Sequence, residues 1–282
     1  MNQKIWYITG ISSGLGKALA NAVMEKGDFV IGTFRNSTQV DTFNSNHKGK
    51  GFAVKLDITN HEEIDQTTNM LIEKFKRIDV LVNNAGIGFV GAIEEASIQE
   101  VRNVFEANFF GVLKLTQNIL PFMRKEHKGH IVQISSHGGI KAFAGFGIYN
   151  ASKFALEGFS EALAQEVAAL GIKVSIIEPG PFRTNFASSN LGEAQKIIKA
   201  YEATAGAFRT KLKSVHGKQE GNPEKAAQAI IQLVSSEKSP LRLPLGKIAL
   251  MTIKMKLESV QSDVESGRSI AENAVYESTI SG

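Results

Sequence analysis

The sequence predicts a single doubly wound α/β domain, in which a parallel sheet carries helices on both faces. Short apolar runs alternate with helical patterns along the 282 residues, and no linker or internal repeat divides them. Most of these runs are apolar on consecutive residues, which is typical of strands covered on both faces. Strands that alternate with helices imply right-handed crossovers and a parallel sheet.

Six apolar runs predict the core strands. They are Ile5–Thr9, Phe29–Phe34, Phe52–Leu56, Val80–Val82, Ile131–Ile134 and Val174–Ile177. A final short strand is expected within Ser239–Gly246, where Pro244 restricts it to a sheet edge or a strand end. Between the strands, Asn60 with Glu63 and Ser97 with Glu100 predict capping boxes at helix starts.

Composition and charge exclude several classes of protein. The chain has no cysteine, which excludes disulfides and thiolate metal sites and fits a reducing compartment. Its six histidines are scattered, so no metal site is expected. The N-terminal apolar run is too short for a signal peptide, and no run is long enough to span a membrane. The net charge of +4 is spread along the chain and does not favour nucleic acid. We therefore expect a cytoplasmic protein that binds a small anionic ligand.

A glycine-rich loop between the first strand and the next helix predicts a phosphate site. Its residues are Thr9, Gly10, Ser12, Ser13, Gly14, Leu15 and Gly16. Glycine lets the backbone approach a pyrophosphate closely, and the helix that follows offers N–H groups and a partial positive charge. A tight turn without a ligand is the alternative, because glycine patterns alone are weakly specific.

The ends of the next strands predict which dinucleotide binds. The second strand ends at Arg35, where an acid would hold the ribose of NAD(H) and an arginine would accommodate the 2′-phosphate of NADP(H). We therefore favour NADP(H) and leave NAD(H) open; the alternative is a solvated surface arginine. Asp57 ends the third strand and could accept a hydrogen bond from the adenine. The fourth strand ends in Asn84, Ala85 and Gly86, whose small side chains would let the chain pass under a ribose.

Tyr149 and Lys153 predict acid–base chemistry. Residues four apart share one helix face, so both side chains point the same way. A nearby ammonium and an oxidised nicotinamide would each lower the pKa of the phenol, which could then exchange a proton with a carbonyl or alcohol. Ser136 ends the fifth strand at the same sheet edge and could donate to the substrate oxygen. A surface phenol near a lysine is the alternative for the pair taken alone.

Together these motifs resemble the short-chain dehydrogenase/reductase family, which has a Rossmann-type fold. The matching residues span Ile5 to Thr184 and are T9-G-x-x-x-G-x-G16, N83-N-A-G86, Asn108, Ser136, Y149-x-x-x-K153 and P179-G180 with Thr184. The resemblance implies that Tyr149 is the acid/base and that Lys153 tunes it and binds ribose. It also implies that Ser136, rather than Ser135, orients the substrate.

The resemblance implies further roles. Asn108 would shape a water-mediated proton relay; it lies in the helical pattern Ser97–Met123, which N108-F-F-G111 interrupts. Pro179, Gly180 and Thr184 would hold the nicotinamide end of the cofactor. The segment 185–221 would be a partly helical substrate lid. The phrases I177-E-P-G-P-F-R-T184 and S239-P-L-R-L-P-L-G246 are similar to the hydroxysteroid-dehydrogenase-like branch, which implies an apolar carbonyl or alcohol substrate.

The region 247–282 predicts a C-terminal helix and tail. Leu250, Ile253, Leu257, Val260 and Val264 repeat at a three–four spacing, which indicates a narrow apolar seam. We expect this seam to dock on the body or on a second subunit, as in a homodimer or homotetramer, rather than on a membrane surface.

The leading hypothesis is an NADP(H)-dependent oxidoreductase that interconverts a carbonyl and a secondary alcohol. The first alternative is a non-catalytic nucleotide sensor or scaffold on the same fold, since fold does not fix function. The second is a nucleotide-sugar epimerase, which shares Tyr-x-x-x-Lys but differs in the spacing of its phosphate loop.

Overall fold

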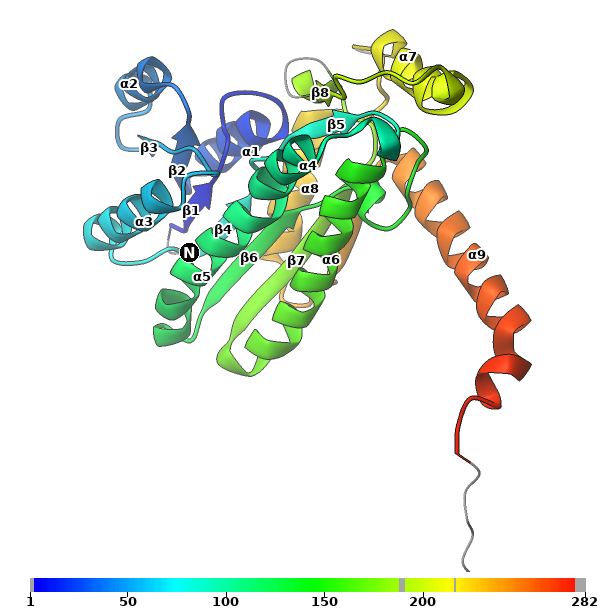
Figure 1. The fold of residues 1–282 in the computed structure, drawn as a ribbon. Coiled ribbons are helices and arrows are strands. Elements are labelled where there is room, and N and C mark those ends of the chain that lie inside the picture. The colour runs from blue at the N-terminus through cyan, green and yellow to red at the C-terminus, as the bar shows by residue number, and fades with distance from the viewer. Residues whose placement is uncertain (1–2, 188–190, 216, 277–282) are drawn as a thin grey trace, which may run out of the picture.

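The computed structural model describes residues 3–187, 191–215 and 217–276, and its centre is a parallel sheet (Figure 1). The strand order is β3-β2-β1-β4-β6-β7-β9, and every neighbouring pair is parallel. The strands are β1 (Ile5–Ile8), β2 (Phe29–Phe34), β3 (Gly51–Lys55), β4 (Val80–Asn83), β6 (Gly129–Ile134), β7 (Ile172–Pro179) and β9 (Arg242–Leu245). All six predicted core strands and the final strand are confirmed, with small differences at their ends.

Helices cover both faces of this sheet. They are α1 (Gly14–Glu25), α2 (Ser37–Asn46), α3 (His61–Phe75), α4 (Ile98–Phe105), α5 (Gly111–Lys125), α6 (Gly147–Val167), α7 (Ala207–Ser214), α8 (Pro223–Ser235) and α9 (Lys247–Glu272). Helices α1 and α8 pack on one face, and α3, α5 and α6 pack on the other (Figure 1). Each face of the sheet has its own hydrophobic core, and alternate side chains of β1 point into the two cores. Trp6 packs with α1 and α8, and Tyr7 packs with α3 and α5. The predicted doubly wound fold is therefore confirmed.

The strand order reverses at β1, which lies between β2 and β4. At such a point the connections from neighbouring strands run to opposite faces of the sheet. Their separation leaves a crevice at the carboxyl ends of the strands. Parallel strands place all these ends at one edge of the sheet. Residues that follow β1, β2, β4, β6 and β7 in the sequence therefore meet at this crevice.

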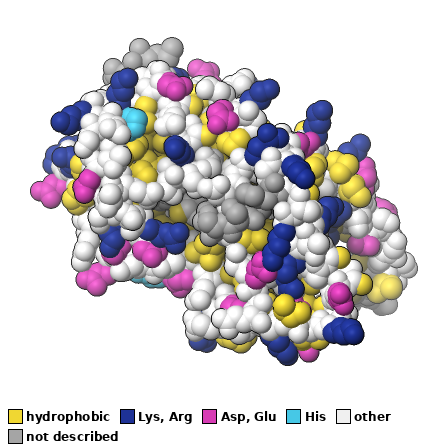
Figure 2. Space-filling model, turned by 90° about the horizontal axis from the view of Figure 1, so that it is seen from above, with side chains coloured by type: hydrophobic (Ala, Val, Ile, Leu, Met, Phe, Trp, Pro, Cys, Tyr) yellow, Lys and Arg dark blue, Asp and Glu magenta, His cyan; other side chains and the backbone are white. Residues whose placement is uncertain are grey.

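The surface seen from above, in the orientation of Figure 2, carries mixed charge. Lys and Arg side chains are scattered among acidic and hydrophobic ones and do not form a single basic stripe on this face. In the parts of the chain that the structure describes, no helix is both long enough and apolar enough to cross a membrane.

The two predicted capping boxes differ in outcome. At α4 the box is complete: the Ser97 hydroxyl accepts from the Glu100 N–H, and the Glu100 carboxylate accepts from the Ser97 N–H at 2.8 Å. At α3 only half of the box forms. Asn60 accepts from the Glu63 N–H at 3.1 Å, but the Glu63 carboxylate accepts from the Asp57 N–H instead. The Asp57 N–H, in the loop before α3, therefore takes the place that the Asn60 N–H would have in a complete capping box.

A π-helical turn over Glu106–Phe110 separates α4 from α5, where the sequence predicted an interruption. Gly111, directly after this turn, packs against the loop that follows β3. A Cβ at Gly111 would lie only 2.1 Å from the Ile58 carbonyl oxygen. A residue with a side chain would therefore push α5 away from this loop.

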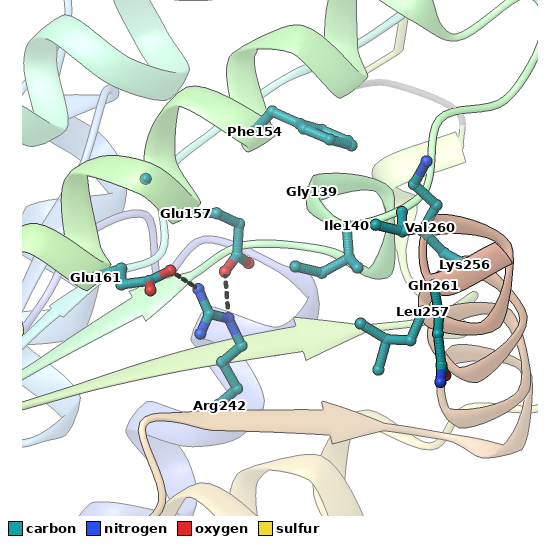
Figure 3. Close-up of a pocket in the computed structure, with 11 residues that line it drawn as sticks. Gly139, Ile140, Phe154, Glu157, Glu161, Arg242, Lys256, Leu257, Val260 and Gln261 are labelled. Atoms are coloured by element: carbon teal, nitrogen blue, oxygen red, sulfur yellow. Dashed lines mark hydrogen bonds and ion pairs between the residues drawn. The ribbon is translucent and has the colours of Figure 1, made fainter. Parts of the chain in front are cut away.

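Arg242 attaches the edge strand β9 to α6 (Figure 3). Its guanidinium donates to the Glu157 carboxylate at 3.1 Å and to the Glu161 carboxylate at 2.6 Å. Pro244 lies in this edge strand, where proline was expected. The ion pairs fix the end of the sheet on which α9 begins.

The segment 185–221 contains more regular structure than the sequence indicated. Strand β8 (Leu191–Glu193) pairs in parallel with β5 (Gly88–Val90), and neither strand was predicted. Three- and five-residue helical turns precede α7, so the segment is partly helical as expected. Residues 188–190 and 216 of this segment, and 277–282 of the predicted tail, lie outside the described residues.

Replacing Gly111 by alanine should destabilise the protein by about 1–3 kcal/mol, because the new methyl group would overlap the Ile58 carbonyl. Gly158→Ala is the matched control: Gly158 is exposed in α6, and nothing in the described structure lies within 4 Å of an added Cβ. Alanine there should stabilise the helix by about 0.5–1 kcal/mol. Urea unfolding followed by circular dichroism measures both effects. Equal stability of the two variants would contradict the tight packing at Gly111.

Candidate active site

The phosphate loop leads from β1 into α1 with two glycines in left-handed conformations. Gly10 and Gly14 have φ angles of +70° and +57°, which residues with side chains rarely adopt. Helix α1 has no acidic residue in its first turn, and the Ser13 side chain makes no capping hydrogen bond. Its first N–H groups therefore remain available to an anion, which is the donor set that a pyrophosphate needs.

Thr9 and Asn84 fasten this loop to the end of β4. The Thr9 hydroxyl accepts hydrogen bonds from the N–H groups of Asn84 and Ala85, each at 3.0 Å. The Asn84 side chain donates to the carbonyls of Thr9 and Gly10 at 2.9 and 3.0 Å. A Cβ at Gly16 would lie 2.4 Å from the Asn84 amide nitrogen, so a glycine is required where the helix passes this bridge.

A cleft of about 1130 Å³ opens at this edge of the sheet. Of the residues predicted from the sequence, those that line it are Gly10, Ser12, Ser13, Gly14, Leu15, Gly16, Arg35, Asp57, Asn84, Ala85, Gly86, Ser136, Tyr149, Lys153, Pro179, Gly180 and Thr184. Thr9 and Asn108 do not line the cleft; both are buried behind its wall. The predicted cofactor and catalytic residues thus share a single cleft with two supporting residues behind it.

Tyr149 and Lys153 extend from α6 into the floor of the cleft. Both are almost fully buried, at 5% and 6% exposure. The Lys153 ammonium donates to the Ile134 carbonyl at the end of β6 at 2.9 Å and lies 5.9 Å from the centre of the Tyr149 ring. The Ser136 hydroxyl accepts from the Gly138 N–H at 2.9 Å and is also hydrogen-bonded with Tyr149.

Burial controls the ionisation of both groups. It raises the pKa of the Tyr149 phenol to about 12, and the hydrogen bond with Ser136 acts in the opposite direction. Burial also lowers the pKa of Lys153 to about 8, while Glu157 acts to raise it. The shift of the phenol pKa is upward and not the expected lowering, because desolvation dominates and favours the neutral form of each group. At neutral pH the phenol is protonated and can serve as a proton donor.

Asn108 uses its side chain to brace the wall of the cleft. It lies in the π-helical turn and is fully buried. Its amide oxygen accepts from the Ile87 N–H at 2.8 Å, and its amide nitrogen donates to the Ile87 carbonyl at 2.9 Å and to the Ser152 hydroxyl at 3.0 Å. Asn108 thus joins the loop after β4 to α6 close to Lys153. Gly86 lies between them, since a Cβ there would be 2.9 Å from the Asn108 oxygen and 3.7 Å from the Lys153 nitrogen.

Arg35 and Asp57 lie at the end of the cleft beside the phosphate loop. Arg35 is exposed and forms no ion pair within the part of the chain that the structure describes. The Asp57 carboxylate accepts from the N–H and hydroxyl of Thr59 at 3.0 and 2.8 Å, which fixes its orientation. Both residues are therefore positioned at the mouth of the cleft with groups that suit an adenosine.

Thr184 lies across from the phosphate loop. A Cβ at Gly14 would lie 3.2 Å from the Thr184 Cβ, so the segment after β7 passes directly over the start of α1. The Thr184 hydroxyl accepts from the Phe186 N–H at 3.3 Å. Backbone donors, hydroxyls and the Arg35 guanidinium thus face one cleft, which is the set of groups that a dinucleotide needs.

The far end of the cleft is apolar, and the sequence indicated only the part of it that lies in the segment 185–221. Its lining includes Phe143, Phe146, Phe186, Leu191, Phe208, Leu212, Ile248 and Met251. The Phe146 ring centre lies 4.4 Å from that of Tyr149 and 5.3 Å from that of Phe208. These residues come from three distant segments, so no local pattern could have placed them together. The aromatic content of the 143–146 turn was a further signal that the sequence offered.

His137 connects the turn after β6 to the first turns of α9. Its Nδ1 lies 2.9 Å from the Thr252 hydroxyl, and burial lowers its pKa to about 4, so the ring is neutral at neutral pH. The contact brings Ile248, Met251 and Thr252 of α9 into the wall of the cleft.

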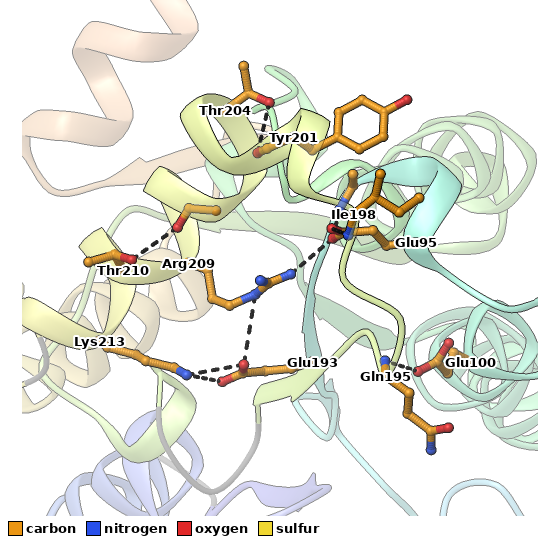
Figure 4. Close-up of polar contacts among 12 residues, drawn as sticks. Glu95, Glu100, Glu193, Gln195, Ile198, Tyr201, Thr204, Arg209, Thr210 and Lys213 are labelled. Atoms are coloured by element: carbon orange, nitrogen blue, oxygen red, sulfur yellow. Dashed lines mark hydrogen bonds and ion pairs between the residues drawn. The ribbon is translucent and has the colours of Figure 1, made fainter.

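Glu95 holds the segment 185–221 against the body (Figure 4). This carboxylate is buried and accepts from the Ile198 N–H at 2.8 Å and from the Arg209 guanidinium at 2.9 Å. Outside this contact, Glu193 pairs with Lys213 at 2.8 Å. The buried Glu95–Arg209 pair therefore fixes α7, whose Phe208 faces the cleft.

Comparison with known proteins places this architecture in a family. The family model described as short chain dehydrogenase matches residues 4–195. A 3-ketodihydrosphingosine reductase of Bacteroides thetaiotaomicron is 39% identical over 252 residues, which cover 88% of this chain and 90% of that protein.

Solved structures agree with this assignment. The crystal structure of a short-chain dehydrogenase from Streptomyces avermitilis is 41% identical, with a TM-score of 0.92 over 98% of this chain and all of that one. A short-chain dehydrogenase/reductase from Burkholderia phymatum, solved in complex with NAD, has the same fold at 22% identity, with a TM-score of 0.80 over 93% of this chain and 95% of that one. The chain belongs to the short-chain dehydrogenase/reductase family of oxidoreductases.

Proposed function

We propose that the protein is an NADP(H)-dependent oxidoreductase that interconverts a carbonyl and a secondary alcohol, with Tyr149 as acid/base. The observation that carries the proposal is the shared cleft: a protonated phenol, the Ser136 hydroxyl and the phosphate loop all face it. A bound nicotinamide would supply or accept the hydride.

Each side chain has a distinct task in this proposal. Ser136 donates to the substrate oxygen and orients it toward Tyr149, whose phenol gives its proton to that oxygen during reduction. Lys153, held by the Ile134 carbonyl, keeps its positive charge near the phenol and binds ribose hydroxyls. Asn108 keeps the Ile87 loop and α6 in place around them. Tyr149 is protonated at neutral pH, as a proton donor in reduction must be.

Arg35 supports NADP(H) over NAD(H). It follows β2 at the position where an acid would hold the ribose of NAD(H), and it lines the cleft. Its guanidinium has no competing carboxylate among the described residues and can make two charge-assisted hydrogen bonds to a phosphate. Ser12, Ser13 and Thr184 would hold the remaining polar groups of the cofactor.

The apolar lining at one end of the cleft is evidence for an extended apolar substrate. Phe143, Phe146 and Phe208 surround the approach to Tyr149, and Leu212 and Met251 extend that surface. A relative named for the reduction of 3-ketodihydrosphingosine supports the same class of substrate. In this proposal, 185–221 is the substrate lid, because Phe186 and α7 lie over the cleft.

Tyr149→Phe should reduce turnover by at least about a hundredfold, because it removes the proton donor and leaves the ring in place. A panel of long-chain and polycyclic ketones, followed at the NADPH absorbance, provides the assay. The matched control is Tyr7→Phe, which removes another buried phenol that lies in the sheet core away from the cleft. The control should keep turnover, and both variants should keep the wild-type dissociation constant for NADPH. Turnover retained by Tyr149→Phe would remove this residue from its proposed role.

Arg35→Asp should weaken NADPH binding by about ten- to a hundredfold, because two charge-assisted hydrogen bonds are replaced by repulsion. NADH binding should change little. Lys48→Asp makes the same charge change at an exposed position after α2, outside the cleft, and controls for the long-range field. Titration of both cofactors by fluorescence gives the four dissociation constants. Equal losses for NADPH and NADH would overturn the cofactor assignment.

Arg209→Met should raise the KM of the active ketone by about tenfold or more, because it leaves the buried Glu95 carboxylate without its charged partner and loosens α7. Lys213→Met is the control, since its pair with Glu193 is exposed and contributes about 0–1 kcal/mol. NADPH affinity should be unchanged in both variants. A loss of cofactor affinity as large as the rise in KM would contradict the lid.

A further inference from the structure

Helix α9 is attached to the body only by its first turns. Ala249 and Thr252 are its buried residues, and beyond them the helix extends away from the sheet (Figure 1). It runs over Lys247–Glu272, so most of its length contacts little of the rest of the described chain. An isolated helix with exposed apolar groups needs a partner to be stable in water.

The apolar seam of α9 is exposed except at Ile253, which is half-buried. Leu250, Leu257 and Val264 are 57%, 61% and 62% accessible, and Val260 is 41% accessible. With Ile253 they follow the a and d positions of a heptad, which is the pattern of a helix that packs along another helix. The seam therefore predicts that the partner surface is another helix.

A groove of about 490 Å³ separates this seam from α6 (Figure 3). Leu257 and Val260 form one wall, and Ile140 and Phe154 form the other. Phe154 is 42% accessible although it is a large aromatic residue. The apolar side chains of the two walls do not cover each other, so a helix placed between them would bury both sets. Lys256 and Gln261 of α9 and the Glu157–Arg242–Glu161 cluster also line the groove.

The charges on α9 favour an antiparallel over a parallel partner helix. The half from Lys247 to Leu257 carries three lysines and no acidic residue, whereas the half from Glu258 to Glu272 carries four acidic residues and one arginine. Two copies of this helix placed antiparallel bring each basic half against an acidic half. A parallel pair would bring like charges together, which disfavours that arrangement.

We propose that α9 is a dimerisation arm: α9 of a second copy of this chain packs antiparallel against it in the groove beside α6. In the register that the heptad gives, Leu257 of each copy faces Val260 of the other, and Ile253 faces Val264. The flanking residues Lys256 and Asp263 then lie opposite each other across the two-fold axis. Neither forms an ion pair within its own described chain.

The same charges disfavour a membrane surface as the occupant. A helix that binds anionic lipids carries basic residues along its whole polar face. Here the outer half, from Glu258 onward, carries net negative charge and would be repelled by such lipids. The occupant is therefore a second copy, and vesicle binding becomes an outcome of the test.

The absence of cysteine from the chain permits a register-specific cross-link. The full-length double variant Lys256→Cys with Asp263→Cys should form a covalent dimer on mild oxidation, seen on non-reducing gels and lost with reductant. Two cysteines seven residues apart on one helix cannot bond to each other. Each single variant should remain largely monomeric on the same gel. Strong cross-linking of the single variants would indicate a parallel pair and overturn the proposal.

A charge reversal tests the same contact without cysteines. Lys256→Glu should weaken self-association several-fold by analytical ultracentrifugation, and adding Asp263→Lys in the same chain should restore it. Circular dichroism of both variants checks that α9 still folds. Unchanged association in the single variant would overturn the proposal. So would binding of the wild-type chain to phosphatidylserine vesicles together with failure of the double-cysteine variant to cross-link.

Discussion

The arrangement of the cleft depends on one hydrogen bond, from the buried Lys153 ammonium to the Ile134 carbonyl at the end of β6. An ammonium in a dry site is unstable unless its donors are used, so this contact fixes both the rotamer of Lys153 and the distance between α6 and the sheet. Tyr149 lies one turn earlier on α6 and takes its position from the same constraint. Asn108 acts on the other side of the lysine by joining the Ile87 loop to α6.

Desolvation sets the protonation states of the two titratable groups in the site. The same burial that makes Lys153 easier to deprotonate makes Tyr149 harder to deprotonate. Below pH 8 the lysine is charged and the phenol is protonated, which is the combination that proton donation to a carbonyl requires. Oxidation of an alcohol needs the phenolate, and a positive charge on the cofactor would help to form it.

Features encoded by a few adjacent residues were predictable, and features assembled from distant segments were not. The strands, the phosphate loop and the α6 pair follow from local patterns, because strand ends in a parallel sheet converge on one edge. The roles of Thr9 and Asn108 behind the wall depend on contacts with Asn84 and Ile87, which spacing alone does not give. The pairing of β5 with β8 and the Glu95–Arg209 contact join residues about a hundred positions apart. Burial of the phenol, which reverses the expected direction of its pKa shift, also exists only after folding.

Helix α9 belongs both to the cleft and to the proposed contact between two copies of the chain. Its first turns supply Ile248 and Met251 to the apolar wall, and Thr252 is held by His137, next to Ser136. The heptad seam begins at Leu250, within those same turns. A helix is stiff along its axis, so a second copy that fixes the outer part of α9 also fixes the wall residues at its base. Pairing of two chains would therefore complete the apolar end of each cleft without contributing a residue to it.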